Sequence, residues 1–167
     1  RGRRRGALGG RRTDAAGRVT KTKYDALGRI TETIYPDGAS QTTEYDAAGQ
    51  VLAQIDELGH RTTMVYDDAN RRVTTRDAAG NESVSIMDEA GRLIAAIDAL
   101  GRTTRFEYDA LGRNVRVVYA DGSTETTEFS NAGNDQPSSK TDALGRITRY
   151  EYDALGNRIA ETRNGVA

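Results

Sequence analysis

The chemistry open to this chain is limited first by its nucleophiles and bases. The sequence contains one histidine, His60, and no cysteine, which excludes thiolate nucleophiles, disulfides and thiolate zinc sites. His60 follows Gly59 at a place where other copies of the same pattern carry arginine, such as Arg29. A catalytic triad needs a nucleophile and an orienting acid at defined geometry, and the sequence marks neither. We therefore interpret His60 as a variant of a repeated position and predict no catalytic residue, no metal site and no cofactor.

Aspartate is the second residue type whose spacing invites a chemical role. Ten segments read Asp-x-x-Gly, for example residues 98–101. Calcium-binding loops need alternating acids, as in DxDxDG, or the GGxGxD spacing, and this pattern has neither. A glycosidase needs a pair of acids that differ from their neighbours, whereas each acid here has an equivalent 21 residues away. Capping of turns accounts for every copy.

Tyrosine and arginine are the remaining candidates, for ligand stacking and for anion binding. A tyrosine at the end of a strand is typical of a core residue whose hydroxyl is bonded at the rim, so we favour core over a platform for sugars or bases. An arginine that follows a turn can pair with an acid of a neighbouring hairpin or stack on a tyrosine ring. A stripe that binds anions is the alternative, which interleaved glutamates weaken. The arginines are Arg18, Arg29, Arg71, Arg92, Arg102, Arg113 and Arg146.

Charge is balanced over the chain but not at its start. The 24 Lys and Arg against 25 Asp and Glu leave a net charge of -1, so no global field favours nucleic acid or a membrane. Arg1 to Arg12 carries six arginines and no acid, and such an arm can bind nucleic acid through phosphates. A flexible arm or a diverged repeat is the interpretation we favour. No apolar run is long enough to span a membrane, and no signal peptide is visible.

A repeat of 21 residues positions all of these side chains. Tyrosine followed by aspartate recurs on this period, and Met87 and Phe129 replace the tyrosine in two copies. The last copy is two residues late because of an insertion near residues 134–137. We predict an arm or diverged repeat over residues 1–13 and about seven repeats over residues 14–167. The positions with a predicted structural role are Tyr24, Asp25, Gly28, Tyr45, Asp46, Gly49, Tyr66, Asp67, Asn70, Asp88, Gly91, Tyr108, Asp109, Gly112, Phe129, Gly133, Tyr152, Asp153 and Gly156.

Each repeat holds two turns, because a second series of turns begins at Asp14, Tyr35, Asp56, Asp77, Asp98, Tyr119 and Asp142. We predict type I turns in which the first residue accepts backbone N–H groups and the fourth has a positive φ. Glycine suits that fourth position, and Asn70 occupies it in one copy.

The segments between the turns alternate apolar and polar residues, which predicts strands of about five to seven residues. Val51, Ala53 and Ile55 form one such set, and Met64 and Tyr66 belong to another. The expected fold is all-β: an antiparallel meander of tandem hairpins in a curved sheet, with one face packed and the other exposed to water.

Residues 101–113, GRTTRFEYDALGR, and residues 145–157, GRITRYEYDALGN, resemble the YD repeat of the Rhs family. The resemblance extends over about residues 14–165. This family includes bacterial Rhs polymorphic toxins, some delivered by type VI secretion, the C components of insecticidal toxin complexes, and the teneurins. The resemblance implies a long β-sheet that spirals into a hollow shell, with a cleaved C-terminal toxin held inside in the bacterial members.

The same resemblance implies a function and partners. We expect a non-catalytic segment of the wall of a secreted or surface-exposed shell that encloses and protects a C-terminal toxin. Its partners would be further YD repeats and the core of a longer parent chain, of which this sequence looks like a fragment, and the enclosed toxin. The alternative is an adhesin-like module at the cell surface that binds carbohydrate or a protein receptor.

Overall fold

The computed structural model of the chain describes residues 9–130 and 135–164. The described residues form strands and turns, with no helix among them. This confirms the predicted all-β fold. The strands are β1 (Gly9–Thr13), β2 (Val19–Tyr24), β3 (Ile30–Ile34), β4 (Ser40–Tyr45), β5 (Val51–Ile55), β6 (Arg61–Asp67), β7 (Arg72–Arg76), β8 (Glu82–Met87), β9 (Leu93–Ile97), β10 (Thr103–Tyr108), β11 (Asn114–Val118), β12 (Thr124–Phe129), β13 (Pro137–Thr141), β14 (Ile147–Tyr152) and β15 (Arg158–Asn164).

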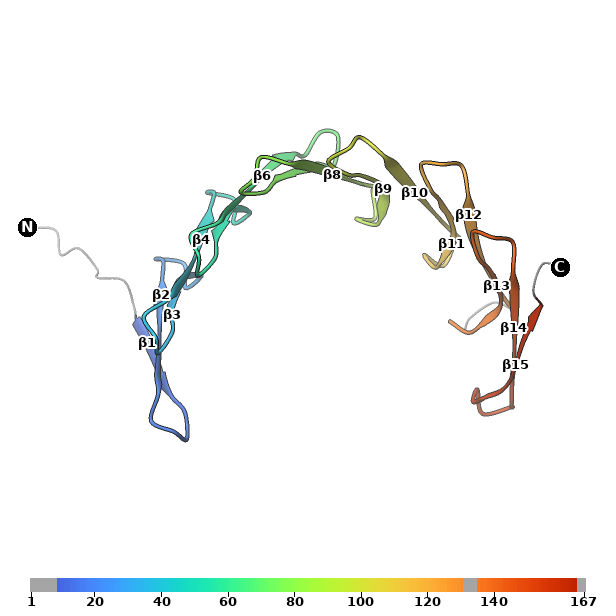
Figure 1. Ribbon diagram of the computed structural model, residues 1–167, viewed down its shortest axis with the longest axis horizontal. Coiled ribbons are helices and arrows are strands. Elements are labelled where there is room, and N and C mark those ends of the chain that lie inside the picture. Colours follow the sequence, from blue (N-terminus) through green and yellow to red (C-terminus); the bar gives the residue numbers. More distant parts are fainter. Residues whose placement is uncertain (1–8, 131–134, 165–167) are drawn as a thin grey trace, which may run out of the picture. The chain divides into compact units, whose positions relative to one another are not determined.

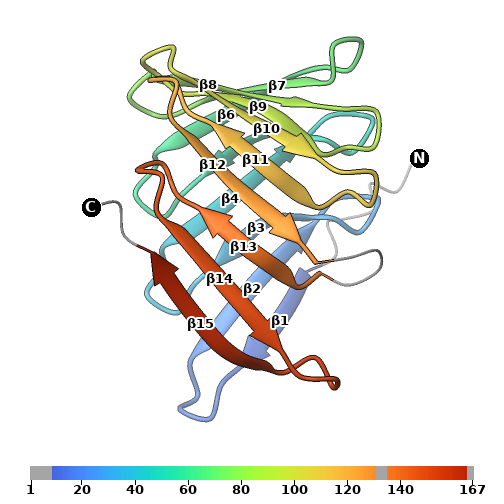
Figure 2. The same cartoon turned by 90° about the vertical axis from the view of Figure 1, so that its right-hand side faces the viewer.

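The strands follow one another in the sheet in chain order, from β1 to β15. The chain divides into two compact units, and each is described by itself. Unit 1 comprises Arg1–Asp67 and Val73–Glu82, and unit 2 comprises Asp68–Arg72 and Ser83–Ala167. In each unit the described strands form a single layer (Figure 1). The pairings defined within the units, β1 to β6 and β8 to β15, are all antiparallel and join strands adjacent in sequence. Figure 2 shows the alternating directions of β12 to β15.

The ends of the chain differ from the predicted boundaries in one respect. Gly9–Thr13 form strand β1, which pairs with β2; this segment lies within residues 1–13, for which an arm or a diverged repeat was predicted. The rest of the predicted arm, residues 1–8, lies outside the described residues. Gly133 and the first residue of the predicted insertion, Asn134, also lie outside them, and β13 begins at Pro137.

The prediction of one packed and one exposed face is wrong. Ala53 pairs with Thr63, so Val51, Ala53 and Ile55 share a face with Thr63, whereas Met64 and Tyr66 point to the opposite face. In β5 and β6 the two apolar sets therefore lie on opposite sides of the sheet. Ala53, fully buried, and Val84, 8% exposed, are the buried hydrophobic residues of the described chain. Each face is thus a mixed surface, because a single layer has no second layer to bury against.

Candidate functional site

The turns lie in two rows, because successive turns of a meander fall at opposite ends of the strands. We call the turns that follow Tyr24, Tyr45, Met87, Tyr108 and Tyr152 the tyrosine row. The second row comprises the turns that begin at Asp14, Tyr35, Asp56, Asp77, Asp98, Tyr119 and Asp142. The rows share one turn geometry and differ in what surrounds it.

In the turns that begin with aspartate, the shared geometry is built around that residue. Asp25 Oδ1 accepts hydrogen bonds from the N–H groups of Leu27 and Arg29 at 2.9 and 3.0 Å, and Oδ2 accepts one from Arg29 Nε at 2.6 Å. The N–H of Gly28 donates to the carbonyl of Asp25 at 3.1 Å. The same bonds recur around Asp98 in the second row. Six of the seven arginines that follow a turn pair with the aspartate of their own turn, namely Arg18, Arg29, Arg92, Arg102, Arg113 and Arg146. Arg71 instead donates from Nε to the Met87 carbonyl at 3.4 Å.

Twelve turn glycines have φ between 77° and 94°, a conformation that glycine adopts without steric strain. Among the described residues the one non-glycine residue with positive φ is Arg71, at 49°. The prediction that Asn70 takes this position is therefore wrong. Strand β6 includes Asp67, and the Arg71 N–H donates to the Asp68 carbonyl, so this turn is displaced by one residue.

These hydrogen bonds favour the ionised form of the turn aspartates. The backbone N–H of Arg29 lowers the pKa of Asp25 below its ordinary value of 3.8, against a smaller opposing effect of desolvation. The side chain of Arg102 lowers the pKa of Asp98 in the same way. The carboxylates are therefore held as anions by the turns that they cap.

In the tyrosine row the arginine also contacts the aromatic ring of the next repeat. The guanidinium carbons of Arg29, Arg92 and Arg113 lie 4.4, 4.9 and 4.1 Å from the ring centroids of Tyr45, Tyr108 and Phe129. Each pair is separated by sixteen residues in the sequence. The side chains of the three arginines are 26%, 37% and 15% exposed, in the same order. An arginine followed sixteen residues later by an aromatic residue is therefore a sequence pattern from which these cation–π contacts could have been predicted.

Tyrosine hydroxyls join successive repeats at the same ends of the strands. Tyr66, Tyr108 and Tyr152 donate hydrogen bonds to the carbonyls of Val51, Leu93 and Pro137 at 2.9, 2.8 and 3.0 Å. Each carbonyl lies fifteen residues before its tyrosine. These tyrosines are partly buried and bonded to the backbone.

In the second row the same arginines remain open to solvent. The side chains of Arg18, Arg102 and Arg146 are 69%, 66% and 50% exposed, and each pairs with the aspartate of its own turn. His60 takes the place of arginine in this row. Its Nδ1 lies 2.9 Å from Asp56 Oδ2, and its side chain is 61% exposed. The hollow beside it contains threonine hydroxyls, but no described residue is hydrogen-bonded to the other ring nitrogen.

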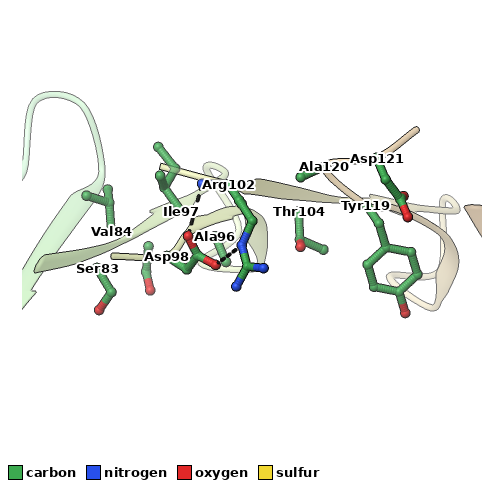
Figure 3. Close-up of a pocket in the computed structure, with 11 residues that line it drawn as sticks. Ser83, Val84, Ala96, Ile97, Asp98, Arg102, Thr104, Tyr119, Ala120 and Asp121 are labelled. Atoms are coloured by element: carbon green, nitrogen blue, oxygen red, sulfur yellow. Dashed lines mark hydrogen bonds and ion pairs between the residues drawn. The ribbon is translucent and has the colours of Figure 1, made fainter. Parts of the chain in front are cut away.

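Three equivalent hollows lie along the second row. We name them after the turn aspartate that each contains: the Asp56 hollow in unit 1, with a volume of about 250 Å³, and the Asp98 and Asp142 hollows in unit 2, of about 600 and 440 Å³. They recur two repeats apart, so that Thr62, Thr104 and Thr148 occupy the same position in each. In Figure 3, Ser83, Thr104 and Tyr119 of the Asp98 hollow point to one side of the sheet, and Val84 and Ile97 to the other.

No group of three or more His, Asp or Glu residues in the described part of the chain could hold a metal ion. None of the described residues forms a helix with the length and hydrophobicity required to cross a membrane.

The comparisons with known proteins match this architecture. The model of the RHS repeat family matches residues 11–40, 45–82, 88–124 and 133–165, which is well over half of the chain. No curated protein matches it significantly.

Among solved structures, the chain is similar to the TcdB2–TccC3–Cdc42 structure, with 16% identity and a TM-score of 0.52, covering 95% of this chain. It is similar to the TcdB2–TccC3–TEV structure, with 18% identity and a TM-score of 0.50 over 94% of the chain. The structure of TcdB2–TccC3 without its hypervariable C-terminal region is similar as well, with 16% identity and a TM-score of 0.51 over 94%. At these identities the likeness shows the fold. The chain spans 12%, 12% and 11% of the three solved chains.

Proposed function

The chain belongs to the RHS repeat family, and on that premise we propose that it forms part of the wall of a larger Rhs-type shell, without catalysis of its own. The observation that carries the proposal is the single layer of strands in each unit, in which Ala53 and Val84 are the buried hydrophobic residues. A globular enzyme buries a core between two layers. A wall needs only strands that continue from repeat to repeat.

The proposed mechanism is containment. Each repeat contacts its neighbours in sequence, as in other repeat proteins, so the wall extends without a separate core. The backbone hydrogen bonds between antiparallel strands join each strand of the wall to its neighbours. The ion pairs and cation–π contacts of the turns fix its rims. Such a wall encloses a partly unfolded segment and excludes proteases from it.

We propose that the cargo is a C-terminal toxin segment of a longer, secreted parent chain. In support, one similar solved structure is of TcdB2–TccC3 without its hypervariable C-terminal region. This chain spans 12% of the first solved chain that it matches, so the cargo, the secretion and the remaining repeats are all part of the proposal. The adhesin-like alternative stands second, because three tyrosines that could serve as ligand platforms direct their hydroxyls to backbone carbonyls.

Limited proteolysis of the intact parent protein tests containment. The segment beyond residue 167 should be cleaved from the chain yet remain bound and resistant to protease until mild denaturant opens the shell, as followed by mass spectrometry. Immediate digestion of that segment, or its absence from the parent, would overturn the proposal, and a glycan-binding screen on the repeat surface would then follow.

A pair of variants connects the protection to this stretch of wall. Tyr108→Ala removes a hydroxyl bond and a stacked ring between repeats, so protection should be lost at a lower denaturant concentration. Leu100→Ser changes a side chain that is 77% exposed at a turn and should leave protection unchanged. Equal protection in both variants would contradict a role for this wall in containment.

A further inference from the structure

The Asp98 and Asp142 hollows have the same place in the fold but different side chains. In the Asp98 hollow, Ala96 pairs with both Ser85 and Thr104, which forms an uncharged row across three strands. In the Asp142 hollow the equivalent row contains Lys140, which pairs with both Thr127 and Thr148. The position of Tyr119 in the Asp98 hollow is taken by Arg163. Two neutral positions have therefore become cationic.

The two cations of the Asp142 hollow flank one threonine. Lys140 and Arg163 pair with Thr148 from opposite sides, so their side chains emerge on the same face with one strand between them. Strands lie about 4.8 Å apart, and side chains of this length can therefore converge on one group above Thr148. Thr148 is 9% exposed and accepts a long hydrogen bond of 3.4 Å from Arg163 Nε.

The acids nearest to these cations are already engaged. Asp142 caps its turn and pairs with Arg146 at 2.7 Å. Glu125 accepts a hydrogen bond from Tyr119. Glu161 lies 3.0 Å from Arg158 and 3.8 Å from Arg163. Lys140 forms no hydrogen bond or ion pair with any residue that the structure describes.

One further polar group lines the same hollow but is separate from the two cations. The Nδ2 group of Asn114, a lining residue, is buried and has no hydrogen-bond partner within the described chain. Buried donors are almost always paired, and a donor left unpaired carries a desolvation penalty. Asn114 lies on β11, three strands from Thr148 of β14, so its Nδ2 group is too distant to contact a group held above Thr148.

We infer that the Asp142 hollow is a binding site for an oxyanion, a carboxylate or phosphate group held by Lys140 and Arg163. Both cations donate charge-assisted hydrogen bonds to such oxygens. The Asp98 hollow lacks both cations, so we expect it not to bind an oxyanion, and it serves as the control site within the same chain. This inference does not depend on the proposed wall function, because it concerns one surface of unit 2.

The experiment is an NMR titration of the isotope-labelled chain with inorganic phosphate and, separately, with glutarate, at constant ionic strength. The backbone amides of Lys140, Thr148 and Arg163 should shift in a saturable way. Tighter binding of phosphate or of glutarate identifies which oxyanion the site prefers. Absence of saturation with both probes would overturn the site.

Substitutions borrowed from the equivalent hollow provide matched variants that the fold already accommodates. Lys140→Ala and Arg163→Tyr copy Ala96 and Tyr119, and each should weaken binding about tenfold, as loss of a hydrogen bond to a charged group predicts. Arg149→Gln removes one positive charge next to Thr148 but on the opposite face, and should leave binding unchanged. An equal loss in Arg149→Gln and Lys140→Ala would show general charge screening and overturn the inference.

The reciprocal transfer tests sufficiency. The double variant Ala96→Lys with Tyr119→Arg should give saturable shifts around Thr104 on addition of the better probe. Shifts confined to the Asp142 hollow in this variant would show that the two cations alone do not make the site.

Discussion

The two rows of turns use the same aspartate, glycine and arginine but place the arginine in different surroundings. Arg113 in the tyrosine row is 15% exposed and lies over Phe129, whereas Arg102 in the second row is 66% exposed. Both pair with the aspartate of their own turn. The residue sixteen positions later is Phe129 for Arg113 and Val118 for Arg102. The same aspartate–arginine turn therefore contacts the next repeat in the tyrosine row, whereas in the second row it is only a solvent-exposed turn cap.

The difference shows that repeat-to-repeat cohesion is concentrated along one edge. Tyrosine hydroxyls and stacked guanidinium groups connect neighbouring repeats at the tyrosine row. The hollows, the histidine and the candidate oxyanion site all lie beside the second row. We therefore expect changes in the tyrosine row to affect stability and changes in the second row to affect binding.

Acidification should have the largest effect, since it removes the part common to both rows. The aspartates with lowered pKa are Asp14, Asp25, Asp56, Asp77, Asp88, Asp98, Asp109, Asp121, Asp142 and Asp153. A carboxyl whose pKa falls on folding stabilises the fold above its ordinary value of 3.8, and this contribution is lost as the pH falls through the lower, folded value. Thermal midpoints by circular dichroism should be level from pH 7 to about pH 5 and fall steeply below about pH 4. A midpoint unchanged down to pH 2 would contradict this assignment.

Removal of a ring from the tyrosine row should have the next largest effect. Tyr108→Ala deletes a partly buried ring, its contact with Arg92 and its bond to the Leu93 carbonyl, and should lower the free energy of unfolding by about 2–4 kcal/mol. Tyr108→Phe keeps the ring and should lower it by about 0.5–1.5 kcal/mol. Urea unfolding of both variants measures the difference, and equal losses would assign the whole effect to the hydroxyl.

A valine at a turn glycine should have an intermediate effect that is the same in both rows. Gly112 and Gly101 have φ of 82° and 77°, so Val is strained at both, by about 1–3 kcal/mol. A Cβ at Gly112 would also lie 3.6 Å from Arg92 Nη1, whereas one at Gly101 meets no atom within 4 Å. Because 3.6 Å is an ordinary van der Waals separation, both variants should lose about the same stability, through the backbone strain alone. A melting temperature equal to that of the parent in either variant would contradict the turn geometry.

Loss of the arginine should have the smallest effect and most directly compares the rows. Arg113→Ala removes a stacked, largely buried guanidinium group and should lower the free energy of unfolding by about 1 kcal/mol through the lost cation–π contact. Arg102→Ala should leave it nearly unchanged, because exposed ion pairs contribute little. If chemical denaturation gave equal losses, cohesion would not be concentrated at the tyrosine row.

The sequence alone determined the features that depend on local interactions. The period of 21 residues, the paired turns and the alternating strands follow from short-range preferences of Asp, Gly and β-branched residues. The prediction that failed concerns the fourth position of the turn at residues 67–70, where Asn70 was expected to have a positive φ. Asn70 tolerates positive φ, but β6 extends through Asp67 and the turn moves by one residue, because strand pairing outweighed a local preference.

The tertiary structure decided which face each side chain occupies and which residues meet across strands. A one-residue difference in register exchanges the faces of a strand, so the separation of Ala53 from Met64 depends on the pairing of Ala53 with Thr63. The convergence of Lys140, Thr148 and Arg163 has the same origin. These residues are separated in the sequence by turns, and only the antiparallel register places them side by side.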